Sequence, residues 1–395
     1  MNIKIRKSKA TVGLAFIVLC FCYMIPNYAQ YQVSPLGSRI VEEYGLQLSQ
    51  LSLLFSAPMI PAIFLSLLSG LLLDRFGTKS VIGVGLTVTA IGCVIRAFSD
   101  SYMLLFVGTM LTGFSACFIN AGSGKIVGNL YNHKEVPGKM GILMAASTAA
   151  MTIANFTSAY FSSLRNAFIA SSIIAFIGLI LWFLFQKDTK QENGTSKSSG
   201  IEIKDCLKIT VKNVDVWLIA FALFFIMAAN MIIGSFLPTA LGTRSISITI
   251  SGYIAACYTV GNFLGCLIAP ICIAKLRSQK RVLLIFSVVA AIGVAFAWMI
   301  PQTVFLAAGM LLTGIFLGGL IPTLLALPVQ IPEIGPVYAG TAGGMIGTIQ
   351  LLGAVLMPSY ILIPVSGKNF MVLFGLGGLC MVAAAVLCQC IRRID

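Results

Sequence analysis

Long apolar stretches, each of roughly twenty residues or more, follow one another along nearly the whole chain. They fall near residues 11–31, 47–73, 80–98, 102–124, 139–161, 166–186, 214–238, 248–273, 282–300, 303–327, 339–361 and 369–390. A helix needs about 20 apolar residues to cross the hydrocarbon core of a bilayer. These stretches are apolar on nearly all sides and lack the two-residue alternation of barrel strands. The pattern therefore predicts an all-α membrane protein with twelve transmembrane helices.

The composition excludes an ordinary water-soluble domain. Hydrophobic residues make up 58% of the 395 residues and charged residues only 10%, whereas soluble domains carry about 25% charged residues. A chain with so few polar groups could not cover a water-exposed surface. We therefore expect membrane lipids to surround most of this protein.

The positive charges sort by the side of the membrane that the spans assign to them. The net charge is +14, from 26 Lys and Arg residues. With the N-terminus in the cytoplasm, 21 of these 26 fall in cytoplasmic segments. The five outside are Arg39, Arg96, Arg165, Arg244 and Lys368. This positive-inside distribution predicts that both termini are cytoplasmic, and it explains the basic balance without a nucleic-acid partner.

Cysteine and histidine usage argues against a disulfide framework and a metal site. Of the eleven cysteines, only Cys206 lies outside the predicted spans, in a cytoplasmic loop, and the chain has one histidine, His133. No pair of cysteines has metal-ligand spacing, so we expect no metal and no cofactor. The first thirty residues could also be read as a cleavable signal peptide. Removing them would leave eleven spans and reverse the loop charges, so we expect them to form the first span.

The chain repeats itself at an offset of about 200 residues. Gly108-Thr-Met-Leu-Thr-Gly113 matches Gly309-Met-Leu-Leu-Thr-Gly314, and Leu36-Gly-Ser-Arg39 matches Leu241-Gly-Thr-Arg244. A repeat of six spans keeps its orientation, which predicts two parallel six-helix bundles related by an axis along the membrane normal. We expect an N-terminal bundle over 1–186, a polar cytoplasmic linker over 187–213 and a C-terminal bundle over 214–395.

The loop between the second and third predicted spans carries a family signature. Gly70-Leu-Leu-Leu-Asp74-Arg75-Phe-Gly77-Thr-Lys79 resembles the glycine, aspartate, arginine, glycine and basic motif of the major facilitator superfamily. The resemblance implies a conformational gating role for Gly70, Asp74, Arg75, Gly77 and Lys79, with Asp74 contacting the start of the eleventh span near residues 338–340. From the residues alone, Gly77 suits a turn with positive φ. The equivalent loop of the second half has Ala274 where the acid would stand.

Polar side chains recur on the spans that would line a site between the two bundles. On the first span they follow one another at helical spacing, and further amides and phenols lie on spans four, five, seven, eight and eleven. Each amide could instead join neighbouring helices by hydrogen bonds. As a set we expect them to contact the solute: Tyr23, Asn27, Gln30, Tyr31, Asn120, Asn155, Asn230, Tyr258, Asn262 and Gln350.

Charged side chains are scarce within the predicted spans. No Asp, Glu or His lies deep in any of them, so no proton-coupled carboxylate relay is visible. Lys125 and Arg96 are the cations nearest to a central site. Both could extend their charged ends to the membrane interface. Otherwise Lys125 could contact an anionic solute or compensate a helix terminus, and Arg96 is a second possible anion contact.

These observations predict secondary transport of a small polar organic solute across the plasma or inner membrane, by a monomer that needs no ATP. The resemblance implies alternating access as the mechanism. The alternative is proton-driven efflux of amphipathic drugs, although Thr109 stands where the resemblance to such antiporters would place an arginine. A receptor or an integral-membrane enzyme is a third alternative. An enzyme would need clustered catalytic groups at one depth, which the sequence lacks.

Overall fold

The computed structural model describes residues 9–131, 135–186, 210–367 and 369–392. Within them it shows helices and no strand. Twelve of the described segments are long and apolar enough to cross a membrane. Each overlaps one of the predicted stretches, so the prediction of an all-α protein with twelve transmembrane helices is confirmed. Most of the predicted linker, residues 187–209, lies outside the described residues.

The N half contributes six spans, built from nine α-helices and two short 3₁₀ turns. In chain order these are α1 (Lys9–Tyr31), α2 (Gly37–Tyr44), α3 (Leu48–Ser56), η1 (Ala57–Met59), α4 (Ile60–Phe76), α5 (Thr78–Ala97), α6 (Tyr102–Leu111), α7 (Phe114–Leu130), α8 (Val136–Thr157), η2 (Ser158–Tyr160) and α9 (Leu164–Phe185).

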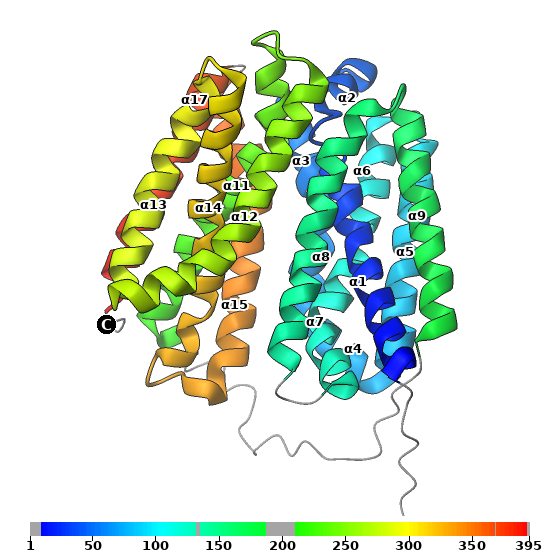
Figure 1. Cartoon of the computed structure of the whole chain (residues 1–395), viewed down its shortest axis with the longest axis vertical. Helices are drawn as coiled ribbons and strands as arrows, with labels where there is room; N and C mark the ends of the chain where they lie inside the picture. The colour runs from blue at the N-terminus through cyan, green and yellow to red at the C-terminus, as the bar shows by residue number, and fades with distance from the viewer. Residues whose placement is uncertain (1–8, 132–134, 187–209, 368, 393–395) are drawn as a thin grey trace, which may run out of the picture.

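The C half contributes the other six spans. Its elements are α11 (Val214–Gly242), α12 (Ile248–Leu276), α13 (Gln279–Phe296), η3 (Ala297–Met299), α14 (Thr303–Leu325), η4 (Leu327–Gln330), α15 (Gly335–Leu356), the π-helical turn η5 (Met357–Leu362), α16 (Ile363–Ser366) and α17 (Phe370–Cys390). Helix α1 begins and α17 ends on the same side of the molecule, called the terminal side below (Figure 1). The opposite side, where α2 lies, is called the far side.

Two spans of the N half are broken where they touch each other. The second span is interrupted by η1, which contains Pro58, and the fourth is interrupted at Thr112 and Gly113. A Cβ atom on Gly113 would lie 1.8 Å from the carbonyl oxygen of Pro58. The Thr89 hydroxyl of α5 donates to the Thr112 carbonyl (3.1 Å) and accepts from the Ser115 N–H (3.2 Å). It therefore satisfies backbone groups that the break exposes in a medium without water.

In the C half, α12 and α14 pack backbone against backbone. Glycines of each helix face the other, and a Cβ at Gly261 or Gly314 would lie 2.2 Å from a carbonyl oxygen across the contact. Small residues of this kind let transmembrane helices approach closely where water provides no driving force between them. The pair packs beside α11.

The buried apolar residues fall into two clusters, and their distribution shows how the halves meet. One cluster joins residues throughout the C half to N-half residues at the far-side ends of their spans, such as Val33, Leu36 and Leu51. The other contains only N-half residues, nearer the terminal side, such as Val18, Ile82 and Val127. Among the described residues, the two halves therefore share a core on the far side, whereas the terminal-side core of the N half contains nothing from the C half.

Candidate functional site

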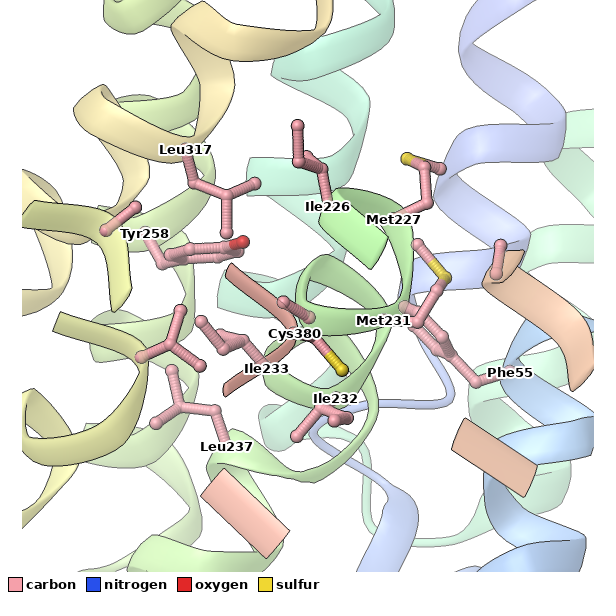
Figure 2. Close-up of a cluster of buried hydrophobic side chains, with 14 of the residues drawn as sticks. Phe55, Ile226, Met227, Met231, Ile232, Ile233, Leu237, Tyr258, Leu317 and Cys380 are labelled. Carbon is pink, nitrogen blue, oxygen red and sulfur yellow. The ribbon is translucent and has the colours of Figure 1, made fainter. Parts of the chain in front are cut away.

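The far-side contact between the halves centres on an aromatic side chain. Phe55 of α3 is fully buried, and its ring meets Tyr31 edge-on with the ring centroids 5.2 Å apart. Gly234 of α11 lies beside this ring, because a Cβ there would be 3.0 Å from two ring carbons. Figure 2 shows Met231 on the side of α11 that faces Phe55. Gln30 fixes the backbone by donating from Nε2 to the Phe55 carbonyl at 3.0 Å.

The contacts among Gln30, Tyr31, Phe55, Met231 and Gly234 are called the far-side closure below. Polar contacts accompany it. The Ser52 and Ser359 hydroxyls are 3.2 Å apart and join α3 to η5. The hydroxyls of Thr152 and Thr259 are 2.9 Å apart and join α8 to α12. The far-side ends of the two bundles are therefore held by hydrogen bonds as well as by apolar packing.

A cavity of about 720 Å³ lies beyond this closure on the far side. Both halves line it, mainly with apolar side chains such as Val41, Leu48, Ile363 and Phe370, together with Thr239. This cavity is called the far-side vestibule below.

Three of the predicted lining residues come together in the N half. The Tyr23 hydroxyl donates to Asn120 Oδ1 at 2.5 Å, which joins α1 to α7. One turn further along α1, Asn27 donates to the Tyr23 carbonyl at 2.8 Å. Asn120 is exposed and Asn27 is half-buried, so both amides keep polar atoms available to a solute.

The C half repeats this local arrangement on α12. Asn262 donates to the Tyr258 carbonyl four residues earlier, at 3.4 Å, and is half-buried. The Tyr258 hydroxyl is buried and lies beside the Asn262 side chain. It lies close enough to the Tyr31 phenol of the N half for electrostatic interaction. Gln350 of α15 is also half-buried.

Other predicted lining residues are packed inside the protein. Asn155 and Asn230 are 1% and 7% exposed, and the Asn155 backbone abuts Gly252 of α12. Gln30 and Tyr31 belong to the far-side closure described above. Asn27, Asn120, Asn262 and Gln350 are therefore the predicted residues whose amides are at least partly exposed.

The predicted gating loop lies where α4 ends and α5 begins. Gly77 has φ +84° and separates the two helices, which confirms the expected positive φ. The Arg75 guanidinium lies 5.2 Å from the centre of the Phe76 ring, and the Lys79 carbonyl accepts from Trp182 Nε1 at 3.0 Å. Gly70 is within α4. The side chains of Asp74 and of residues 335–340 lie outside the described residues, so their predicted contact stays a prediction.

The two candidate cations differ in their surroundings. Lys125 is half-buried on α7. Arg96 is 1% exposed and donates to the Ala29 carbonyl at 2.9 Å. The expectation that Arg96 extends to the membrane interface is wrong, because its guanidinium is enclosed by α1, α5 and α9 inside the N half.

Acidic groups are rare inside the described spans. Asp215 is buried in the first turn of α11 at the terminal side, where it accepts a hydrogen bond from the Arg392 N–H at 3.1 Å. Within the described residues no three His, Cys, Asp or Glu side chains gather as a metal site would require. Among the described residues, the predicted lining side chains offer hydrogen bonds from amides and hydroxyls.

Comparison with known proteins agrees with this architecture. The family model described as Major Facilitator Superfamily matches residues 13–358. The chain belongs to the major facilitator superfamily. It is thus a multi-pass transporter-family protein of the plasma membrane. Among solved structures of this fold, the nucleoside transporter NupG has a TM-score of 0.77 and 15% identity, covering 96% of this chain and 98% of that one. The inward open xylose transporter XylE from E. coli has a TM-score of 0.75 and 16% identity, covering 97% of both chains.

The curated relatives of this superfamily member match over shorter segments. The probable sulfoacetate transporter SauU of Cupriavidus necator is 33% identical over 24% of this chain and 22% of its own length. Multidrug resistance protein 2 of Bacillus subtilis is 24% identical over 57% of this chain and 58% of its own length. The hexuronate transporter of Bacillus subtilis is 23% identical over 45% of this chain and 43% of its own length. Each alignment thus spans less than two thirds of the relative.

Several residues of the far-side closure could not be found from the sequence. Phe55, Met231 and Gly234 belong to uniformly apolar spans. In such spans the hydrophobic pattern has no period that would distinguish the helix face toward the other half from the face toward lipid. Ser52 and Ser359 are small polar residues of a kind that also occurs throughout transmembrane helices. The single available signal was the proline at position 58, which marks a break next to Phe55.

Proposed function

We propose that this protein binds a small polar organic solute between its two bundles and carries it across the plasma membrane by alternating access. The observation that supports this most is the one-sided contact between the halves. They share a buried core on the far side, whereas the terminal-side core of the N half contains nothing from the C half among the described residues, and partly exposed amides lie on both halves. Two packed units joined at one end can exchange that contact for one at the other end by rocking.

The proposed orientation places the terminal side in the cytoplasm. It follows from the 21 basic residues assigned to that side of the membrane. The structure then corresponds to an inward-facing state with its outer side closed around Phe55. In this proposal the bundles 1–186 and 214–395 move as units, and the loop from Gly70 to Lys79 guides the change on the cytoplasmic side.

The proposed solute is neutral, zwitterionic or weakly anionic. Burying an unpaired charge is costly in a membrane, and the amides at Asn27, Asn120 and Asn262 offer hydrogen bonds without a fixed charge. Because the described spans hold no deep carboxylate, we propose facilitated movement or exchange along a solute gradient, without ATP hydrolysis.

Thermal-shift measurements on the purified protein test this proposal. A bound solute stabilises the folded state by mass action, so we expect a polar metabolite to raise the melting temperature. Asn27→Ala and Asn262→Ala should each abolish that rise, because each removes an amide from one half. Asn166→Ala, at the exposed start of α9, is the matched control and should retain it. A rise that survives both asparagine substitutions would contradict a site between the halves.

Efflux of amphipathic compounds is the second candidate. Its support is the similarity to multidrug resistance proteins 1 and 2 of Bacillus subtilis, at 23% and 24% identity. The same thermal-shift screen separates the two candidates. Stabilisation by lipophilic cations alone would favour efflux, and stabilisation by polar metabolites would favour the first proposal.

A further inference from the structure

Arg96 is a charged residue that neither the closure nor the proposed solute site uses. It stands at the far-side end of α5 and is 1% exposed. Its Nη1 donates to the Ala29 carbonyl at 2.9 Å, and its guanidinium stacks over the Phe168 ring, with Cζ 4.4 Å from the ring centroid. The charge is therefore held deep inside the N half by α1 and α9.

The hydrogen bond from Arg96 to the Ala29 carbonyl has a clear structural reason. In a continuing helix the Val33 N–H would bond to the Ala29 carbonyl, but it donates to Gln30 at 3.2 Å instead. The Ala29 carbonyl is left without its helical partner at the C-terminal end of α1. Arg96 satisfies that carbonyl and places positive charge at the negative end of the helix dipole.

The contact with Ala29 explains only one of the three guanidinium nitrogens, Nη1. Nε and Nη2 are buried and have no hydrogen-bond partner among the described residues. Their N–H groups lie along one edge of the planar guanidinium, the edge that binds both oxygens of a carboxylate in bidentate pairs. Leaving two buried charged donors unpaired is costly. This edge of Arg96 is therefore unpaired and closed to solvent, so an oxyanion pairs with it only where the neighbouring side chains move aside.

Arg96 lines a cavity of about 400 Å³ that is separate from the far-side vestibule. The cavity wall includes Leu164 and Arg165, in the first turn of α9, where unpaired backbone N–H groups and the helix dipole favour an anion. Tyr44 and Ser99 add hydroxyl groups, with Tyr44 Oη 2.9 Å from Ser99 Oγ. Burial is the largest cause raising the pKa of Tyr44, so its phenol stays uncharged at neutral pH.

The acidic residues of the cavity do not neutralise Arg96. Glu43 and Asp100 also line it, but both are exposed. The titratable groups that interact with Arg96 are Cys93 and Tyr44, neither of them a carboxyl group. The buried part of the cavity wall therefore carries the positive charge of Arg96, whereas the exposed part carries Glu43, Asp100 and the basic Arg165. With a single buried cation, the cavity suits one negative charge better than two.

We propose that this cavity is a binding site for a small monocarboxylate reached from the far side, with the carboxylate paired to Nε and Nη2 of Arg96. The site lies within one half, so it is distinct from the solute site between the halves. Arg96 holds Ala29, the residue next to Gln30 and Tyr31 of the far-side closure. Occupancy of the cavity therefore stabilises the end of α1 that carries that closure.

Melting temperatures of the purified full-length protein test the site, in acetate, inorganic phosphate or chloride salts of equal ionic strength at pH 7.4. We expect acetate to raise the melting temperature saturably by about 2 °C over chloride, and phosphate, mostly a dianion, to raise it less. Arg96→Lys keeps the charge but loses the fork, so it should remove the acetate effect. Arg39→Gln is the matched control: Arg39 also donates to a backbone carbonyl on the far side, and the acetate effect should persist.

A second variant covers the case in which Arg96→Lys folds poorly because Ala29 loses its partner. Ser99→Phe fills the cavity and leaves Arg96 in place, and it should also remove the acetate effect. Asn27→Ala should leave that effect intact, which separates this site from the proposed solute site. The proposal is overturned if acetate and chloride act alike, if phosphate acts as strongly as acetate, or if the acetate effect survives Ser99→Phe.

Discussion

A disulfide between positions 52 and 359 is expected to stop transport. The Ser52 and Ser359 hydroxyl oxygens are 3.2 Å apart across the two halves, so Ser52→Cys with Ser359→Cys brings two thiols close to disulfide distance. Oxidation would fix the far-side closure and prevent the halves from rocking. Transport of the solute found by thermal shift should fall by roughly tenfold or more and return after reduction.

The control for this lock is a disulfide within one half. Ser162 Oγ and Asn166 Nδ2 are 3.1 Å apart at an exposed position, and both residues belong to the N half. Ser162→Cys with Asn166→Cys should therefore cross-link without stopping transport. Transport in proteoliposomes, before and after reduction, is the measurement. An active protein with the 52–359 disulfide fully formed would contradict a cycle that opens the far side.

Substitution of Gly113 by alanine is expected to be the most destabilising single-methyl change in the N half. The added Cβ would lie 1.8 Å from the Pro58 carbonyl oxygen, so the breaks in the second and fourth spans would have to separate. Overpacking of this kind lowers the free energy of unfolding by about 1–3 kcal/mol or more. The melting temperature and the yield of monodisperse protein should therefore both fall.

Gly124→Ala is the matched control for that change. Gly124 lies on α7 in the same span, and nothing lies within 4 Å of a Cβ built there. Its melting temperature should be close to that of the unchanged protein. Equal melting temperatures for Gly113→Ala and Gly124→Ala would mean that the two breaks do not pack as described.

The spans could be predicted because a bilayer sets the length and polarity of any helix that crosses it. Their internal breaks could not be placed equally well. Prolines such as Pro26 and Pro238 lie within continuous helices, whereas Pro58 lies in a break. A proline alone therefore does not show where a span is broken. The π-helical turn at Met357–Leu362 likewise depends on packing between the halves.

The candidate site was harder to predict than the fold. An asparagine in a transmembrane helix can bond to its own backbone, as Asn262 does, or lie buried between helices, as Asn155 does. Both arrangements are compatible with the same sequence pattern, because the spans are apolar on nearly all sides and do not reveal their rotation. Arg96 shows the same limit, since its position near a span end could not distinguish the membrane interface from the protein interior.

Labelling of position 120 from each side of the membrane tests the central claim most directly. Asn120→Cys, in a background without other reactive cysteines, places a thiol at an exposed position of α7. In sealed vesicles of both orientations, a membrane-impermeant maleimide should label it from the cytoplasmic side and also from the outside. With the 52–359 disulfide formed, labelling from the outside should disappear and cytoplasmic labelling should persist. Outside labelling that persists in the locked protein, or is absent without the lock, would contradict alternating access.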